Sequence, residues 1–255
     1  MIEINAVYVI VARELKKFFR ERSRLFSSIA RPLLWLFIVG AGLSKLVTGD
    51  RDIPYIQFIF PGIIGMTILF SSIFSSISII WDREFGFMKE ILVAPVSRIS
   101  IIIGKALSGT FVSILQVIII LALYPFIGFK LSFLQVIGAI VISLLLSFCI
   151  SSLGIVIASF YESYESFSVI MNFIIMPMFF LSGAMYPVKL LPEVLRLVSK
   201  LNPLTYGIDA LKYTLLPISE KDMGPDFSFL TDLIFIIVSS IIFVFISSKI
   251  FERRK

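Results

Sequence analysis

The sequence predicts an all-α polytopic membrane protein with six transmembrane helices. Of its 255 residues, 58% are hydrophobic and 16% are charged, whereas about 25% of the residues of a soluble domain are charged. The mean hydropathy is +1.01. Five long stretches contain no Asp, Glu, Lys or Arg: residues 57–81, 106–129, 131–161, 166–188 and 233–248. A soluble core of this chain length could not enclose so many apolar side chains, so lipid must cover many of them.

Six apolar segments are long enough to cross a bilayer, which takes about 20 residues. They are residues 26–47, 57–81, 100–127, 132–160, 167–187 and 229–250. Arg31-Pro32 interrupts the first segment near its start, where the arginine can reach the interface. Because the chain shows no internal repeat and no linker, residues 1–255 are expected to form a single membrane domain.

The basic residues predict the orientation of these spans. If both termini lie in the cytoplasm, 15 of the 23 Lys and Arg residues fall on the inner side and eight on the outer side. The positive-inside rule therefore favours a cell-membrane protein with both termini cytoplasmic. The net charge of +6 comes largely from basic clusters that flank the apolar spans. Such clusters are a topology signal, so no nucleic-acid partner is expected.

Residues 4–24 are expected to form an amphipathic helix that lies in the cytoplasmic interface. Its apolar face carries Ile4, Val7, Tyr8, Val11, Leu15, Phe18 and Phe19. The opposite face largely carries Arg13, Lys16, Lys17 and Arg20. Such a helix can rest on lipid as an anchor or serve as a docking surface, and the two roles are compatible. Four residues are the candidate contacts of this interface helix: Val11, Leu15, Phe18 and Phe19.

Residues 82–97, between the second and third spans, are predicted to form a short cytoplasmic amphipathic helix. Asp82 and Glu84 suit a helix start, and Pro95 ends the helix. One face carries Phe85, Met88, Ile91 and Leu92. Four apolar side chains on so short a helix favour a partner that covers them, and a solvated connector is the alternative.

Residues 188–216 are predicted to form an external hairpin before the last span. Pro192 opens one amphipathic helix, and Asn202-Pro203 caps the start of a second helix and opens it. The second helix carries Leu204, Ile208, Leu211 and Leu215 on one side. Two amphipathic half-helices that directly follow a span indicate a re-entrant or interfacial hairpin.

The residue types exclude several kinds of chemistry. The chain has no His and one Cys, Cys149, so His-based metal sites, Ser-His-Asp triads and internal disulfides are ruled out. The centres of the six predicted spans lack the ionisable residues of proton-coupled transporters. No Walker A sequence is present. We therefore expect a chain without catalytic, metal or cofactor site, and energy supplied by another chain.

Small polar residues follow helical spacing in two of the spans. Ser71, Ser75 and Ser78 do so in the second span, and Ser143, Ser147 and Ser151 in the fourth. This spacing is typical of close helix packing, and lining a translocation route is the alternative. Met178 belongs to a group of methionines around Pro177 that suits either a core or a varied apolar ligand. The candidate residues of a pathway or dimer seam are Ser71, Ser75, Ser78, Met178 and Tyr186.

The order of these parts resembles the ABC type-2 exporter permeases. Two local sequences carry the resemblance more specifically. The second span and its loop read FPGIIGMTILFSSIFSSISIIWDREFGFMKEILVAPVSRISIIIGKAL (60–107), and the end of the fifth span reads FFLSGAMYPVKLLPEVLRLVSKLNPLTYGIDALK (179–212). Both are similar to the daunorubicin-resistance and nodulation-factor export branch of that family.

The resemblance implies a partner that hydrolyses ATP. In this family two permease copies, here expected to be a homodimer in the lipid bilayer, join two ATP-binding subunits that hold ATP and Mg. The resemblance identifies 82–97 as the coupling helix that docks on the ATPase. Its candidate coupling residues are Asp82, Arg83, Glu84, Phe85, Met88, Ile91 and Leu92. The expected function is ATP-driven export of an amphipathic, lipid-linked or drug-like substrate, and the alternative is a membrane scaffold that recruits an ATPase without transporting.

Overall fold

The structure is a computed structural model that describes most of the chain. The described residues are 3–21, 26, 30–40, 42, 54–88, 93, 95–128, 130–161, 163–216 and 224–253. Within these ranges every element is a helix: α1 (Ile4–Arg20), the π-helix η1 (Trp35–Val39), α4 (Tyr55–Glu84), α6 (Arg98–Leu121), the 3-10 helix η2 (Tyr124–Ile127), α7 (Phe133–Phe160), α8 (Tyr164–Ile170), the π-helix η3 (Met171–Ile175), α9 (Met176–Phe180), the 3-10 helix η4 (Val188–Leu190), α10 (Glu193–Lys200), α11 (Pro203–Leu215) and α12 (Phe229–Arg253). The predicted all-α class is therefore confirmed.

Four of the described helices are long and apolar enough to cross a bilayer: α4, α6, α7 and α12. Of two shorter apolar helical stretches, Ala30–Val39 falls within the first predicted span and Tyr164–Phe180 overlaps the fifth. Residues 41 and 43–53, which include the predicted end of the first span, lie outside the described part. The full count of six spans stays a prediction, as does the re-entrant placement of the hairpin.

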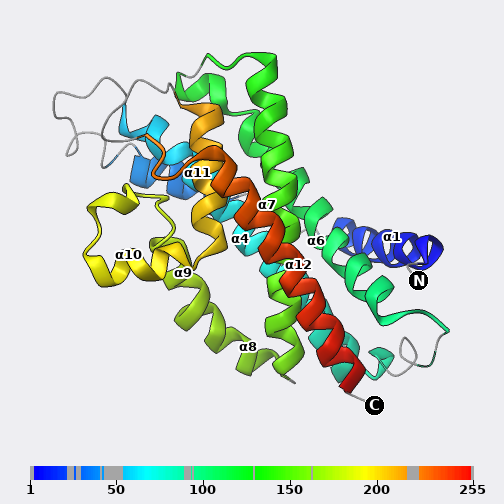
Figure 1. Cartoon of the computed structure of the whole chain (residues 1–255). Coiled ribbons are helices and arrows are strands. Elements are labelled where there is room, and N and C mark those ends of the chain that lie inside the picture. Colours follow the sequence, from blue (N-terminus) through cyan, green and yellow to red (C-terminus); the bar gives the residue numbers. More distant parts are fainter. Residues whose placement is uncertain are drawn as a thin grey trace.

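Helix α4 forms the centre of the bundle (Figure 1). It packs against α6, α7 and α11, and nearly all of its apolar side chains are buried. Helix α12 packs on α7 and α11 but exposes a long apolar surface that includes Ile234, Ile241 and Phe245. Apolar side chains that cover the outside of a membrane helix face lipid or another membrane helix.

Prolines explain where two of the predicted spans break. The predicted fifth span, 167–187, is helical only as far as Phe180 and changes to a π-helical turn over Met171–Ile175, just before Pro177. A proline removes one helical hydrogen bond and clashes with the preceding turn, which favours such a π segment. The predicted third span, 100–127, leaves the α-helical form after Leu121, and Pro125 lies in the 3-10 turn that follows.

The hairpin helices form where the sequence predicts them. Asn202 accepts a hydrogen bond from the backbone N–H of Leu204 and caps α11, and Pro192 precedes α10. The four predicted apolar residues of the second helix are all buried: Leu204, Ile208, Leu211 and Leu215. Helix α11 comes very close to α4, since a Cβ atom at Gly65 would overlap the side chain of Ile208.

The serine-rich faces of α4, α6 and α7 pack against one another. The hydroxyl groups of Ser72 and Ser113 lie 2.8 Å apart, and the Ser72 hydroxyl also donates to the carbonyl oxygen of Ser147 at 3.4 Å. A Cβ atom at Gly154 would overlap Ser76. These contacts support the packing interpretation for the serine stripe of the fourth predicted span.

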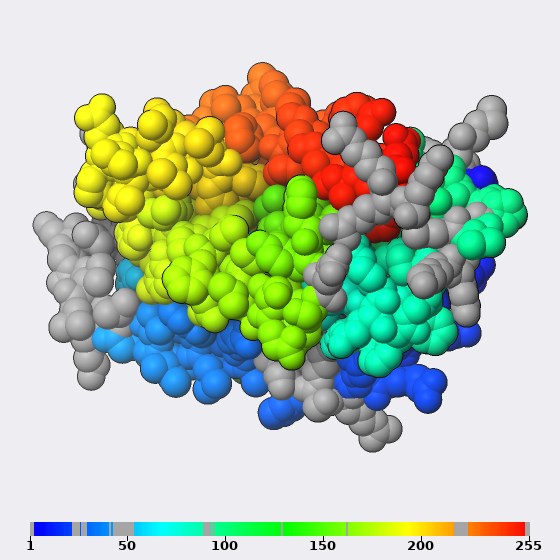
Figure 2. Space-filling model, turned by 90° about the horizontal axis from the view of Figure 1, so that it is seen from below, coloured from blue at the N-terminus to red at the C-terminus, as the bar shows by residue number. Residues whose placement is uncertain are grey.

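The view from the lower end of Figure 1 shows how the bundle is layered (Figure 2). The yellow-green end of α7 and the start of α8 lie in the middle. Helix α12, in orange to red, lies on one side of them, and the blue segment that contains Ala30–Val39 lies on the other. Helix α1 lies crosswise to α7 at the edge of the bundle and packs along α6 (Figure 1).

Candidate functional site

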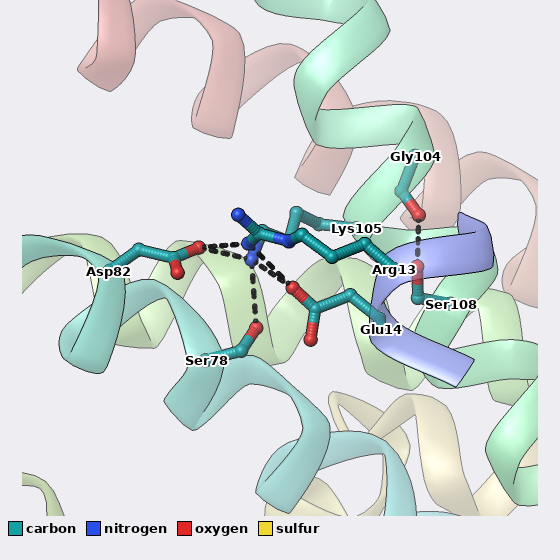
Figure 3. A network of polar contacts seen from close by, with 7 residues as sticks. All are labelled: Arg13, Glu14, Ser78, Asp82, Gly104, Lys105 and Ser108. Atoms are coloured by element: carbon teal, nitrogen blue, oxygen red, sulfur yellow. Dashed lines mark hydrogen bonds and ion pairs between the residues drawn. The ribbon is translucent and has the colours of Figure 1, made fainter. Parts of the chain in front are cut away.

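A charge junction joins three helices at the end of α4. It consists of Arg13 and Glu14 from α1, Asp82 from α4 and Lys105 from α6 (Figure 3). The Lys105 ammonium group donates to Glu14 Oε1 at 2.7 Å and to Asp82 Oδ2 at 2.5 Å. Arg13 Nη2 donates to the same two oxygens, at 2.9 Å and 2.8 Å. The junction therefore holds α1 to the last turn of α4 and to α6.

Lys105 is the buried centre of the charge junction. Its side chain is only 4% exposed, and it gives its third hydrogen bond to the hydroxyl of Ser78 at 3.0 Å. All three donors of the ammonium group are therefore used. The two cations and two carboxylates balance to zero, which offsets much of the cost of removing them from water.

The same charges set the ionisation of Glu14. Burial alone would raise the pKa of Glu14, but the charges and hydrogen bonds of Lys105 and Arg13 outweigh burial and hold it below its ordinary value. Burial also opposes ionisation of Arg13, yet its hydrogen bond to Glu14 and the charge of Asp82 raise the Arg13 pKa above its ordinary value. Both groups are thus charged at neutral pH.

The interface helix α1 reaches the charge junction because it packs closely against α6. A Cβ atom at Gly104 would lie 3.0 Å from Cβ of Ile10, so the glycine allows α1 to lie close to α6. At the start of α1 the backbone N–H of Glu3 donates to the hydroxyl of Ser100 at 2.8 Å. These contacts bring Glu14 over Lys105.

The predicted apolar face of α1 is divided between the protein and its surroundings. Phe18 is buried, Val11 and Leu15 are half-buried, and Phe19 is exposed. Sequence reasoning missed Glu14, which is buried although it lies within a basic helix. A signal was present, because Glu14 is one turn before Phe18 and therefore shares its side of the helix.

An apolar cavity of about 250 Å³ lies next to the charge junction. Its walls come from α1, the Ala30–Val39 helix, α4, α6 and α8. The side chains are mostly aromatic or aliphatic, with few polar groups among them: Phe18, Arg31, Pro32, Met66, Thr67, Phe70, Ser71, Phe74, Ile77, Trp81, Val112, Gln116 and Tyr164. Concave apolar sites with few polar groups are typical of small-molecule and lipid binding.

Arg31 gives the cavity a positive charge. Its guanidinium carbon lies 5.0 Å from the ring centre of Phe70 and 5.7 Å from that of Phe74, within the range of cation–π contacts. The arginine that interrupts the first predicted span therefore lies against the rings of α4. Its exposed head remains available to an anionic group.

The predicted seam residues lie in three different places. Ser71 lines the cavity, and its buried hydroxyl has no hydrogen-bond partner among the described residues. Ser75 lines a small space between α1, α4 and α6, and the Ser78 hydroxyl accepts a hydrogen bond from Lys105 of the charge junction. Met178 and Tyr186 lie at the base of the hairpin, where the Met178 carbonyl accepts from Asn202 and the Tyr186 hydroxyl donates to the carbonyl oxygen of Phe180. Their role in a pathway stays a prediction.

Within the described ranges no three His, Cys, Asp or Glu side chains are placed to hold a metal ion. Cys149 is buried, and burial of this kind keeps a thiol inert.

Comparison with known proteins decides the family. The model of the family described as ABC-2 type transporter matches residues 5–216. The chain belongs to the ABC-2 type transporter family. It is thus a transport permease, which is the membrane subunit of an ABC transporter and pairs with an ABC ATPase subunit.

Individual relatives of this ABC-2 permease agree with the family match. A protein named as transport permease ycf38 from Cyanophora paradoxa is 31% identical over 82% of this chain and 74% of its own length. The inner membrane transport permease YadH of Escherichia coli K12 is 28% identical over 91% of this chain and 90% of its own. Nodulation protein J of Rhizobium meliloti is 26% identical over 75% and 74%, consistent with the branch that the sequence motifs resemble.

The predicted coupling segment of the ABC-2 permease begins differently from its expected form. Asp82 and Glu84 do not start a helix; both lie in the last turn of α4, which runs on to Glu84. The chain then turns at Phe85 and Gly86, where Gly86 has a φ of 81° that few other residues adopt. Ile91 and Leu92 lie outside the described residues.

The described coupling residues face in different directions. Asp82 is buried in the charge junction, and Arg83 donates to the carbonyl oxygen of Tyr161 at 2.7 Å. Met88 is buried, whereas Glu84 is exposed and Phe85 is 71% exposed. Among the described members of this set, Glu84 and Phe85 are therefore the two that are fully exposed to a partner.

Proposed function

We propose that this permease is the membrane part of an ATP-driven exporter that moves an amphipathic, lipid-linked or drug-like molecule outward. A separate ATPase subunit, present in two copies, binds ATP and Mg and supplies the energy. The permease itself catalyses no reaction and acts as a homodimer in the cell membrane.

The proposal is supported by the direct connection between the charge junction and the cavity. Trp81 lines the cavity and directly precedes Asp82, which belongs to the charge junction. Phe18 lines the cavity one turn after Glu14. Lys17 places its ammonium nitrogen 4.4 Å from the centre of the Trp81 ring. A displacement of the end of α4 must therefore change the shape of the cavity.

This arrangement explains how an attached ATPase would drive transport. The exposed turn at Glu84 and Phe85 continues directly from α4, so a push on that turn acts on the charge junction. The junction joins α1, α4 and α6, so these three helices move as a unit. Interfaces of packed helices shift between discrete arrangements rather than deforming smoothly.

The cavity favours an amphipathic substrate. Its aromatic and aliphatic walls suit an acyl chain or an aromatic ring system, and Thr67, Ser71 and Gln116 add hydrogen-bonding groups. The guanidinium of Arg31 suits an anionic head group. A molecule with an apolar body and an anionic head fits these surroundings best.

The ends of the chain support a common cytoplasmic side for both termini. Phe251, near the end of α12, borders the same small space as Met88 and Lys105, so the last helix ends close to the charge junction that holds α1. Helix α1 and the described end of α12 thus lie at one end of the bundle. The same end carries the basic residues Lys16 and Arg20, which the positive-inside rule favours on the cytoplasmic side.

Filling the cavity tests the proposal. We expect Ser71→Phe to abolish ATP-dependent movement of a fluorescent anionic phospholipid to the outer leaflet in proteoliposomes that contain the permease and its ATPase subunit. The added ring occupies the space between α4 and α6, while ATP hydrolysis continues. Val141→Phe adds a similar ring to an exposed position on α7 and should leave movement unchanged.

Two outcomes would contradict the proposal. Unchanged lipid movement in Ser71→Phe would exclude this cavity as the substrate site. If the wild-type complex hydrolyses ATP but moves neither anionic phospholipid nor an amphipathic dye, the alternative of a scaffold that recruits an ATPase is correct.

A further inference from the structure

A second cluster of buried charges lies between α11 and the start of α12. This acid cluster contains Asp209 and Lys212 from α11, Asp226 from the segment before α12, and Asp232 from the first turn of α12. All four side chains are at least 95% buried. The cluster is separate from the charge junction, and no residue of the coupling segment belongs to it.

Two of the three carboxylates have clear structural partners. Asp209 accepts from the backbone N–H groups of Asp226 and Phe227 at 2.8 Å. Asp226 accepts from the backbone N–H groups of Val188 and Lys189 at 3.0 Å, and its Oδ2 lies 3.7 Å from Nζ of Lys212. Hydrogen bonds of this kind stabilise the ionised form of a carboxyl group. Asp209 and Asp226 thus tie α11, η4 and the start of α12 together.

Asp232 has no comparable support. It is fully buried, and within the described part of the chain neither of its carboxyl oxygens has a hydrogen-bond partner. The charged groups that act on it are Asp209, Asp226 and Lys212. The charge of Asp232 also acts on the hydroxyl groups of Tyr206 and Tyr213 of α11. Helix α7, which packs on both α11 and α12, has no charged residue.

The charges do not balance if all three acids are ionised. Lys212 can compensate one of the two supported carboxylates, so an ionised Asp232 would bring the cluster to a net charge of −2. An isolated buried charge is far more costly than its neutral form. A metal ion is not the missing cation, because the acids among the described residues are not placed to bind one.

We propose that Asp232 is a proton-binding site of the permease. Its carboxyl group holds a proton while α11 is packed against α12 and releases it to water when the two helices separate. Proton uptake therefore stabilises the closed hairpin. At alkaline pH the ionised carboxylate repels Asp209 and Asp226, and the contact between α11 and α12 loosens. This inference does not depend on export or on the identity of the substrate.

Infrared difference spectroscopy of the full-length permease in lipid nanodiscs tests the proton directly. The difference between wild type and Asp232→Asn at neutral pH should contain the C=O stretching band of a protonated carboxyl group. This band should be lost as the pH is raised. A spectrum that shows only the bands of an ionised carboxylate at neutral pH would overturn the proposal.

Thermal unfolding of the same samples provides an independent measurement. Asp232→Asn imitates the protonated acid, so it should keep the wild-type melting temperature at neutral pH and lose part of the decrease that the wild type shows at alkaline pH. Asp209→Asn is the matched control, because it replaces an acceptor of backbone N–H groups and should lower the melting temperature at every pH. If Asp232→Asn lowers the melting temperature as Asp209→Asn does, Asp232 is ionised and the proposal is wrong. Neither measurement uses an ATPase or a substrate, so failure here is distinct from failure of the proposed function.

Discussion

Lys105 stabilises the contact between the interface helix and the bundle more than any basic residue on the surface can. Its side chain is 4% exposed and pairs with Glu14 and Asp82. Without it, two carboxylates remain buried with only the half-exposed guanidinium of Arg13. The loss of one partner from a buried ion pair costs far more than the loss of an exposed pair.

We therefore expect Lys105→Met to lower the free energy of unfolding by about 3 kcal/mol, the usual cost of leaving a buried charge without its partner. Thermal unfolding in detergent measures the change. Lys249→Met is the matched control, because Lys249 is exposed and pairs with the exposed Glu252 at 3.5 Å, so its loss should cost about 1 kcal/mol or less. Equal effects of the two substitutions would contradict the assigned role of Lys105.

Glu14 makes the stability of the charge junction depend on pH. Its pKa lies below the ordinary value because Lys105 and Arg13 outweigh burial. A carboxyl group whose pKa is lower in the folded state contributes stability above its unfolded pKa, which is about 4.5. That contribution is lost as the pH falls through the lower pKa of the folded state.

We expect Glu14→Gln to be less stable than wild type at neutral pH and to lose less stability on acidification. The measurement is the melting temperature between neutral pH and the acid range below the ordinary pKa of a glutamate. Glu252→Gln changes an exposed glutamate and should retain the wild-type acid dependence. An acid dependence of Glu14→Gln that matches wild type would show that Glu14 is not the group responsible.

At the scale of elements, local patterns predict the helices well but miss contacts between them. The hairpin helices begin at Pro192 and Asn202-Pro203 as expected, because proline and asparagine act through their nearest neighbours. The end of α4 was predicted wrongly. Acidic residues favour helix starts, yet Asp82 sits in a last turn because Lys105 and Arg13, distant in the sequence, neutralise it.

The same reasoning explains which site residues could be predicted. Phe18 and Ser71 follow from periodicity, because helical spacing reports which face is buried. Glu14 shares the buried side of α1 with Phe18, so its burial could have been predicted, but its partner could not. The burial of Lys105 and Asp232 depends on side chains from other helices and could not be predicted. In the sequence, Lys105 served only as a topology signal. Its predicted cytoplasmic placement is compatible with its buried ion pairs.

At the scale of the whole molecule, charges are buried at both ends of the bundle and absent from its middle. The charge junction lies at the end of α4, and the acid cluster lies between α11 and the start of α12. The described bundle therefore buries more charged side chains at its ends than its composition suggests. The absence of ionisable residues from the span centres still leaves no chain of groups that could relay a proton across the bilayer, so the acid cluster can sense protons without being driven by them.

Coupling across the whole molecule depends on the exposed turn after α4. We expect the double substitution Glu84→Ala with Phe85→Ala to uncouple ATP hydrolysis from lipid movement, because both side chains are exposed where an attached ATPase could push. The ratio of lipid moved to ATP hydrolysed in reconstituted complexes should fall at least tenfold, which corresponds to about 1.4 kcal/mol of lost coupling, while the melting temperature is unchanged. Asp82→Asn provides the contrast, since it alters a buried partner of Lys105 and should lower the melting temperature. If the double variant keeps its transport ratio, the ATPase acts on the permease elsewhere, and the exposed basic residues of α1, Lys16 and Arg20, are the next positions to test.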